Sequence, residues 1–103
     1  MTFTIIGGSG FIGTRLARRF ERSHKQFAIV DKAPSPAFNS FLSCSDVRDK
    51  AKLMDAITEK SVIINLAAEH RDDVRPLSLY DEVNVDGANN VCMVARAKGI
   101  NTI

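Results

Sequence analysis

The chain has 103 residues, of which 45% are hydrophobic and 25% charged, and its formal net charge is +2. This length suits one domain over residues 1–103, and the composition is that of an ordinary globular domain. The small net charge argues against a nucleic-acid partner and a membrane surface, and no run reaches the roughly 20 apolar residues of a membrane span.

The first third of the chain alternates short apolar runs with a helical pattern. Residues 3–6 predict a buried strand that ends at a glycine-rich turn, and residues 27–30 predict a second strand with Asp31 at its carboxyl end. Between these strands, apolar residues recur at helical spacing opposite a basic face. The residues expected on the inner side of this helix are Ile12, Leu16, Ala17 and Phe20.

The middle of the chain continues the alternation. Residues 33–40 hold two prolines and several small residues and predict a loop, and residues 41–44 predict a short third strand. Asp49 is a suitable N-cap for a short helix, which leads into an apolar strand over residues 62–64. The inward residues expected of this helix are Leu53, Met54 and Ile57.

A long helix and the start of another strand complete the pattern. The inner face expected of this helix comprises Leu77, Tyr80, Asn84, Ala88, Val91, Cys92 and Ala95. Gly99 is well placed to end the helix, and residues 100–103 predict the opening of a fifth strand. The alternation predicts an α/β fold with an incomplete, doubly wound parallel sheet of about four strands plus the start of a fifth.

The two cysteines, Cys44 and Cys92, are far apart in the sequence and lack the spacing of metal ligands. We therefore expect no metal site and two small buried thiols. Residues 1–3 run into an apolar strand without a basic leader or a cleavage site. Reduced thiols and the missing signal together predict a cytoplasmic protein.

The glycine-rich turn joins the first strand to the first helix, which is the context of a phosphate-binding loop. Gly7 would form the tight turn, Gly10 would let a ligand approach, and Gly13 would let the helix pack closely on the strand. Free N–H groups at the helix start would then hold a pyrophosphate. Gly8, Gly10 and Gly13 also satisfy a second common spacing, so the loop alone leaves the subtype open. The pattern predicts a Rossmann-type dinucleotide-binding domain.

Asp31 follows the second strand and bears on the choice of cofactor. A carboxylate there can accept hydrogen bonds from both hydroxyls of an adenosine ribose. Its charge would repel a 2′-phosphate, which favours NAD over NADP. Either Lys32 or Arg15 could bind such a phosphate, so NADP stays open as the less favoured cofactor.

Two further segments follow predicted strands. Asp46 and Val47 could read an adenine edge through a carboxylate and a backbone N–H, although Asp46 also suits a plain turn. Residues 65–68 end the fourth strand, and their small side chains would let a flat cofactor lie against the backbone. Ligands of open parallel sheets bind at this edge, where the strand order reverses.

Five segments resemble, in order and spacing, the NAD-dependent epimerase/dehydratase family: residues 7–13, Asp31, and residues 46–49, 65–68 and 80–90. These extended short-chain dehydrogenases/reductases act on nucleotide sugars. The resemblance implies the cofactor-binding N-terminal portion of such an enzyme, with a nucleotide-sugar substrate. We also expect the protein to form a homo-oligomer. The cofactor-binding residues are expected to be Gly7, Gly10, Phe11, Ile12, Gly13, Asp31, Lys32, Asp46, Val47, Leu66, Ala67, Ala68 and Asn84.

The resemblance also implies a role for each group of residues. The glycines would hold the pyrophosphate, Asp31 the adenine ribose, and Asp46 with Val47 the adenine. The two alanines after the fourth strand would line the middle of the cofactor. Asn84 would support the active-site wall by hydrogen bonding.

The family's catalytic groups are a Ser/Thr at the end of the fifth strand and a Tyr-x-x-x-Lys pair on the next helix. The sequence ends before both of them. Its one tyrosine, Tyr80, has Asn84 four residues on in place of lysine and is interpreted as a helix-packing residue. Ile6 stands where the family often has threonine. We expect no catalytic residue within the chain and no turnover by these 103 residues alone.

Two alternatives stay open: a non-enzymatic NAD(P)-sensing or regulatory module on the same fold, and an atypical NADPH-dependent reductase. Glu69 and His70 could face a substrate or the nicotinamide, while residues 71–75 suit a solvated charged loop. A full fifth strand would cover the apolar edge of strand 62–64, but the sequence predicts only the opening of that strand. We therefore also expect dimerisation or aggregation through that edge.

Overall fold

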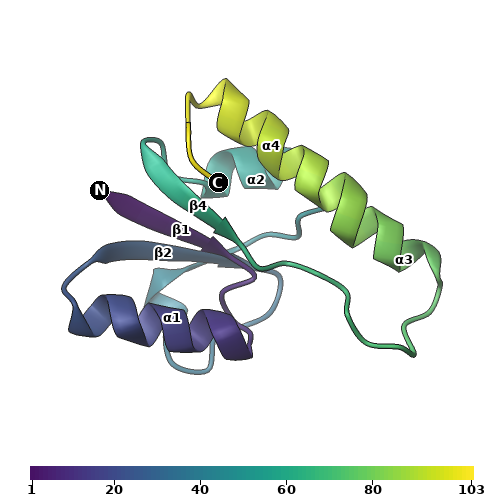
Figure 1. The fold of residues 1–103 in the computed structure, drawn as a ribbon, viewed down its shortest axis with the longest axis horizontal. Coiled ribbons are helices and arrows are strands. Elements are labelled where there is room, and N and C mark those ends of the chain that lie inside the picture. Colours follow the sequence, from purple (N-terminus) through teal and green to yellow (C-terminus); the bar gives the residue numbers. More distant parts are fainter.

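The computed structural model describes residues 1–103, and its strands form one sheet with helices on both faces (Figure 1). Helix α1 covers one face, and α2 and α4 cover the other. The elements in chain order are β1 (Thr2–Ile6), α1 (Phe11–Arg22), β2 (Gln26–Asp31), the 3₁₀ turn η1 (Asn39–Phe41), β3 (Leu42–Cys44), α2 (Lys50–Ala56), β4 (Ser61–Asn65), α3 (Ser78–Asp81), the π-helical segment η2 (Glu82–Asp86) and α4 (Gly87–Ala97). None of these helices is long and apolar enough to cross a membrane.

All neighbouring strands of the sheet are parallel, in the order β3-β2-β1-β4. Strand β1 therefore lies between β2 and β4, with Ile5 opposite Ile29 on one side and Ile64 on the other. The chain moves outward from β1 in one direction first and then in the other. This reversal opens a crevice at the carboxyl ends of the strands. The predicted α/β fold with a doubly wound parallel sheet is confirmed.

The core has two halves because successive strand residues point to opposite faces of the sheet. Ile5 packs with Ala17 of α1 and with phenylalanines from β2 and the following loop. Ile6 belongs to the larger half, which includes Leu53 of α2 and Val91 of α4. Burial on both faces explains why the strands read as continuous apolar runs in the sequence.

Two helix boundaries follow the predicted local chemistry. The Asp49 side chain caps α2 by accepting a hydrogen bond from the Lys52 amide at 3.1 Å. Gly99 follows α4 with a φ of +67°, a left-handed conformation that suits glycine at a helix end. The predicted short third strand is also present, as β3. These features were readable because each depends on a residue type at a fixed local position.

Some predicted helix faces were wrong. Ile12, expected inside, is 65% exposed, because the buried side of α1 runs through Gly13 and Ala17. Leu77, Asn84 and Cys92 are also exposed, and the buried side of the long helix instead runs through Val83 and Gly87. A Cβ on Gly87 would lie 2.7 Å from the Val47 Cγ2 atom, so the closest helix contact is made by a residue without a side chain. A hydrophobic pattern cannot mark such a position as buried.

The expected burial of both thiols was wrong as well, since Cys44 and Cys92 are exposed. Cys44 lies on β3, which forms the outer edge of the sheet, and Cys92 lies beside the buried stripe of α4. The predicted fifth strand is not formed by residues 100–103. Ile100 is buried against the core, and one backbone bond joins the Ile63 amide to the Thr102 carbonyl at 3.1 Å. A single bond does not make a strand ladder.

Candidate functional site

The glycine loop occupies the carboxyl end of β1, in the middle of the crevice. Gly7 has a φ of +78°, and its amide donates to the Val30 carbonyl of β2 at 2.8 Å. A Cβ on Gly7 would lie 2.7 Å from the Ala67 amide nitrogen. Two features therefore require glycine in the turn predicted at Gly7: the backbone conformation and the close approach of the segment after β4.

Gly13 brings α1 against the loop itself. A Cβ at this position would lie 2.5 Å from the Gly8 Cα atom, so only glycine allows the observed packing. Gly10 differs, because its nearest neighbour would be the Gly7 carbonyl oxygen at 3.6 Å, an ordinary contact. Nothing within the chain requires glycine at this exposed position. An open, side-chain-free surface remains there for a ligand.

The N-terminus of α1 borders that open surface. Gly10 is the N-cap residue, no side chain caps the helix, and the first turn has no acidic residue. The amides of Phe11, Ile12 and Gly13 belong to this turn, where N–H groups have no intrahelical acceptor. The helix dipole adds a partial positive charge at the same end. The arrangement suits a phosphate group.

Asp31 braces the glycine loop from the end of β2. Its Oδ2 atom accepts from the Ser9 amide at 2.9 Å, and its Oδ1 atom accepts from the Ala33 amide at 2.9 Å. The Ser9 hydroxyl in turn donates to the Ala33 carbonyl at 2.8 Å. An ionised carboxylate has further lone pairs, so Asp31 can still accept bonds from a ligand hydroxyl. The contribution of Ser9 was not predicted, and no residue-type pattern marks a backbone donor.

A pocket beside the loop collects residues from the ends of all four strands. Six predicted site residues line it together with Ile6, Val30 and Ser45. Those six are Gly7, Asp31, Lys32, Asp46, Val47 and Ala67. Gly10 and Phe11 line a neighbouring hollow with Arg15 and Arg18. The sequence segments thus converge on one edge of the sheet, as their positions after successive strands predicted.

The other predicted residues lie around the pocket. Gly13 is buried behind the loop, whereas Ile12 and Ala68 are exposed. Leu66 continues the β4 ladder, with its amide donating to the Ile6 carbonyl at 2.7 Å. Their part in cofactor binding stays a prediction.

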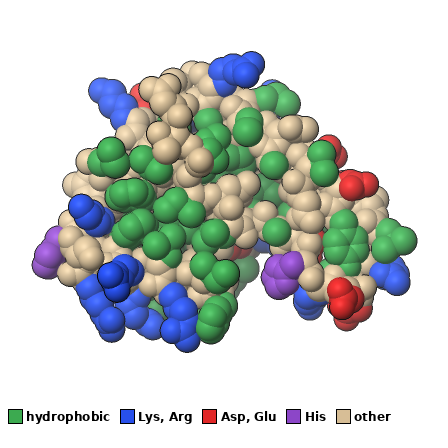
Figure 2. Space-filling view, in the orientation of Figure 1, with side chains coloured by type: hydrophobic (Ala, Val, Ile, Leu, Met, Phe, Trp, Pro, Cys, Tyr) green, Lys and Arg blue, Asp and Glu red, His purple; other side chains and the backbone are tan.

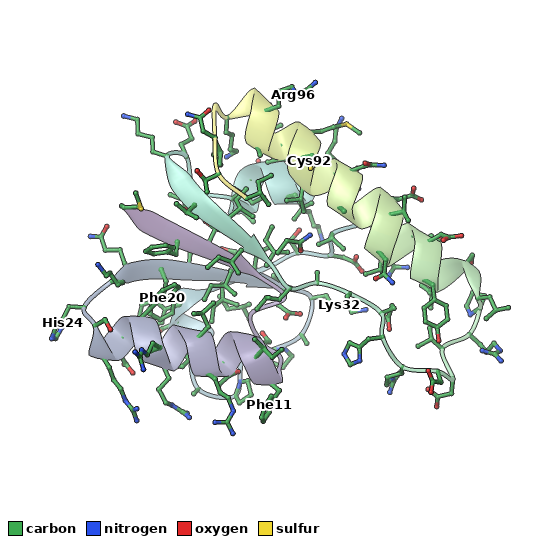
Figure 3. The ribbon with its side chains drawn as sticks, in the orientation of Figure 1. Phe11, Phe20, His24, Lys32, Cys92 and Arg96 are labelled. Carbon is green, nitrogen blue, oxygen red and sulfur yellow. The ribbon has the colours of Figure 1, made fainter.

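Lys32 reaches across this edge of the sheet. Figure 3 labels it at the carboxyl end of β2, and its Nζ atom lies 3.7 Å from the Glu69 Oε1 atom of the segment after β4. The exposed fraction is 57% for the lysine side chain and 19% for the glutamate. The exposed lysine gains little stability from this pair. The pair does hold the Lys32 charge near β4.

Asp46 forms an unpredicted ion pair with Arg48. The Arg48 Nη2 atom lies 2.8 Å from the Asp46 Oδ2 atom, and the Arg48 amide also donates to the carboxylate at 3.0 Å. These hydrogen bonds lower the pKa of Asp46, and the same pair raises the pKa of Arg48. The charge of Asp46 is thereby kept at the pocket wall. Its contact with an adenine stays a prediction.

Asn84 reaches from η2 to the backbone of Glu69. Its Oδ1 atom accepts from the Glu69 amide at 2.8 Å, and its Nδ2 atom donates to the Glu69 carbonyl at 3.0 Å. This pair of bonds has the form of the wall support that the resemblance implied. Tyr80 supports the same loop, because its hydroxyl donates to the Arg71 carbonyl and accepts from the Val74 amide. It therefore does more than pack.

Replacing Asn84 with alanine should release the Glu69 backbone. Two hydrogen bonds are lost, and we expect unfolding to become easier by about 1–2 kcal/mol relative to a matched variant. Asn89→Ala is that match, because Asn89 is exposed on α4 and gains the same helix propensity. Hydrogen exchange should show faster exchange of the Glu69 amide in Asn84→Ala alone. Equal exchange in both variants would contradict the role of Asn84.

The parallel sheet, the glycine loop and the pocket at the switch in strand order define a Rossmann-type nucleotide-binding domain. Residues 4–103 match the 3-beta hydroxysteroid dehydrogenase/isomerase family, and the chain belongs to that family. The resemblance to the NAD-dependent epimerase/dehydratase enzymes is confirmed at the level of this wider group.

A curated relative is the N-acetyl-alpha-D-glucosaminyl-diphospho-ditrans,octacis-undecaprenol 4-epimerase of Escherichia coli O157:H7. The two are 42% identical over 101 residues, which cover 96% of this chain and 30% of the relative. The chain thus spans about 30% of the length of the curated relative that it matches.

Two solved structures share the fold. The UDP-glucose 4-epimerase of Thermus thermophilus, in complex with NAD, superposes with a TM-score of 0.85 at 25% identity, over 98% of this chain and 35% of that one. A short-chain dehydrogenase/reductase superfamily protein from Agrobacterium tumefaciens with bound NAD gives a TM-score of 0.88 at 21% identity, over 98% and 30%.

Proposed function

We propose that this chain is the NAD-binding portion of a sugar epimerase or dehydratase. The observation that carries the proposal is the pocket at the carboxyl ends of the strands, where Gly7, Asp31, Asp46 and Ala67 meet. The uncapped start of α1 and the open Gly10 surface beside it fit a dinucleotide pyrophosphate. The NAD-bound relatives named above support the same choice of cofactor.

Each predicted site residue has a place in this proposal. The amides of the first turn of α1, at Phe11, Ile12 and Gly13, hold the pyrophosphate, while Gly7 and Gly10 give it room. Asp31 binds the adenine ribose, with Lys32 beside it, and Asp46 with Val47 meets the adenine. Small and apolar residues after β4 lie under the middle of the cofactor, and Asn84 supports them through Glu69. The residues under the cofactor are Leu66, Ala67 and Ala68.

The charges of the pocket favour NAD over NADP. The Asp31 carboxylate would face a 2′-phosphate with like charge. The two cations that could offset it each have another partner: the Lys32 Nζ atom lies 3.7 Å from the Glu69 Oε1 atom, and the Arg15 guanidinium carbon lies 4.3 Å from the centre of the Phe11 ring. The ribose of NAD, which carries hydroxyls at this position, suits the carboxylate.

The substrate of the whole protein is proposed to be a sugar linked through a diphosphate. When bound, NAD supplies a hydride acceptor for one sugar carbon and returns the hydride later in the reaction. The first candidate for the group linked to the sugar is a nucleotide, and the second is a polyprenol. The second candidate is supported by the 42% identity to an epimerase of an undecaprenol-linked sugar. Proton-transfer groups are proposed to lie outside these 103 residues, which leaves the chain without turnover.

Calorimetric titration of the chain with NAD and with NADPH tests the proposal. We expect NAD to bind at least about tenfold more tightly, which corresponds to roughly 1.4 kcal/mol. Tighter binding of NADPH would support an atypical NADPH-dependent reductase instead. Binding of neither dinucleotide would overturn the cofactor site. A nucleotide sugar should be left unchanged by the chain with NAD present.

A further inference from the structure

The outer face of α1 carries a concentration of positive charge that the proposed cofactor site does not use. Residues 11–25 hold five basic residues and one acidic residue, so this segment carries +4 and the rest of the chain carries −2. The small net charge of the whole chain, which argued against a membrane surface, therefore conceals a local concentration of positive charge. Four arginines line one shallow hollow on this face: Arg15, Arg18, Arg19 and Arg22. In Figure 2, blue side chains gather at the lower left, where α1 lies. We call these four residues the arginine face.

The arginine face is a continuous stripe along the helix. Phe11, Arg15, Arg18 and Arg22 are spaced by four, three and four residues, which places them on one side of an α-helix. Phe11 is 74% exposed at the start of this stripe and points away from the sheet in Figure 3. Aromatic and basic side chains thus share a single outward surface.

No carboxylate of the chain pairs with these charges, and only Arg15 has a partner, the ring of Phe11. No arginine of the face takes part in an ion pair, and like charges three or four residues apart destabilise a helix. The helix dipole favours Arg19 and Arg22 in the last turn and disfavours Arg15 near the first. The internal physics of the helix therefore accounts for only part of the pattern. A polyanionic partner would account for all of it.

We propose that the arginine face binds the anionic phospholipid surface of a membrane. Basic residues at such a surface gain attraction from the negative lipid headgroups, and an exposed aromatic ring suits the interface. Gly10 and Phe11 share a hollow with Arg15 and Arg18, so the face adjoins the glycine loop. The whole protein would then work at the bilayer that holds a polyprenol-linked substrate. The link to a polyprenol-linked substrate rests on the proposed function, whereas binding to anionic lipid does not.

The test is co-sedimentation of the chain with vesicles of phosphatidylcholine, with and without phosphatidylglycerol. We expect binding only when phosphatidylglycerol is present, and loss of binding at high salt. The triple variant Arg18→Gln, Arg19→Gln, Arg22→Gln should bind about 100-fold more weakly, since each charge contributes about fivefold. Arg15 is left in place because it borders the glycine loop.

A matched triple variant removes the same charge elsewhere: Lys50→Gln, Lys52→Gln, Arg96→Gln. These residues are exposed on α2 and α4, on the other side of the sheet from α1, as Figure 3 shows for Arg96. We expect the affinity of this variant for vesicles to stay within about threefold of the wild type. The arginine face is intact, and only the net charge of the chain changes. An equal loss in both variants would overturn the proposal, as would equal binding of the wild-type chain to both kinds of vesicle.

Two further measurements separate the remaining outcomes. Tighter binding to a single-stranded oligonucleotide than to phosphatidylglycerol vesicles would replace the lipid by a nucleic acid and refute the proposal. NAD titration of the wild-type chain and of the matched triple variant on α2 and α4 should give the same affinity, so a failed cofactor site is recognised separately. If the arginine variant does not fold by circular dichroism, Arg18→Gln alone should still lower vesicle binding about fivefold.

Discussion

Replacing Gly13 with alanine is expected to destabilise the chain by about 3 kcal/mol, because the new Cβ would lie 2.5 Å from the Gly8 Cα atom. The Gly8 Cα atom is part of the backbone and the new Cβ is bonded directly to it, so no side-chain rotation can relieve the clash. The helix propensity of alanine returns about 1 kcal/mol at most. Relief requires α1 to move away from the loop, which displaces its N-terminal amides. Thermal or urea unfolding should show the lost stability, and calorimetry should show lost NAD binding.

Gly10→Ser is the matched change within the same loop. The Cβ at this position has an ordinary contact of 3.6 Å with the Gly7 carbonyl oxygen, and serine is a preferred N-cap residue. We expect the free energy of unfolding to stay within about 0.5 kcal/mol of the wild type. NAD binding should nevertheless fall, because the hydroxyl occupies the open surface and competes for helix amides. Retained NAD affinity in Gly10→Ser would place the pyrophosphate elsewhere.

Asp31→Asn is expected to weaken NAD binding by at least about tenfold, since hydrogen bonds to a charged group are worth roughly 1.5–3 kcal/mol. The amide keeps one acceptor oxygen and loses the other, so the ribose and the loop amides compete for it. The discrimination against NADPH should fall at the same time, because the repelling charge is gone. Parallel titrations with NAD and NADPH measure both effects.

Asp49→Asn provides the comparison for Asp31. It removes the same charge from a carboxylate that caps α2 and lies outside the pocket. Asparagine is as good an N-cap as aspartate, so stability should change by only a few tenths of a kcal/mol. NAD affinity should stay at the wild-type value. A similar loss in both variants would show that net charge, and not the position of Asp31, controls cofactor binding.

Much of the fold was predictable because local signals and global topology agree. The strands lie within one or two residues of the apolar runs, and the Asp49 cap and the Gly99 terminus depend on one residue each. The convergence of Gly7, Asp31 and Asp46 also followed from the sequence. Each comes after a strand, and parallel strands share one carboxyl edge.

The failures involve contacts that a residue-type pattern does not encode. The buried stripe of the long helix passes through Gly87, which allows close packing because it has no side chain. The Ser9 amide that meets Asp31 is a backbone group present at almost every position. Arg48, which pairs with Asp46, lies within a predicted polar turn, where a charged residue is common. Such contacts become visible only when distant segments are brought together.

The bonds from Ser9 and Ala33 to Asp31 have a kinetic consequence. They fix the glycine loop in its working shape before any dinucleotide arrives, so no ordering of the backbone has to accompany association. Capture should then proceed in a single step at a rate set by diffusion and orientation. In the proposed site, the aspartate that binds the ribose would thus also remove a loop-ordering step from binding.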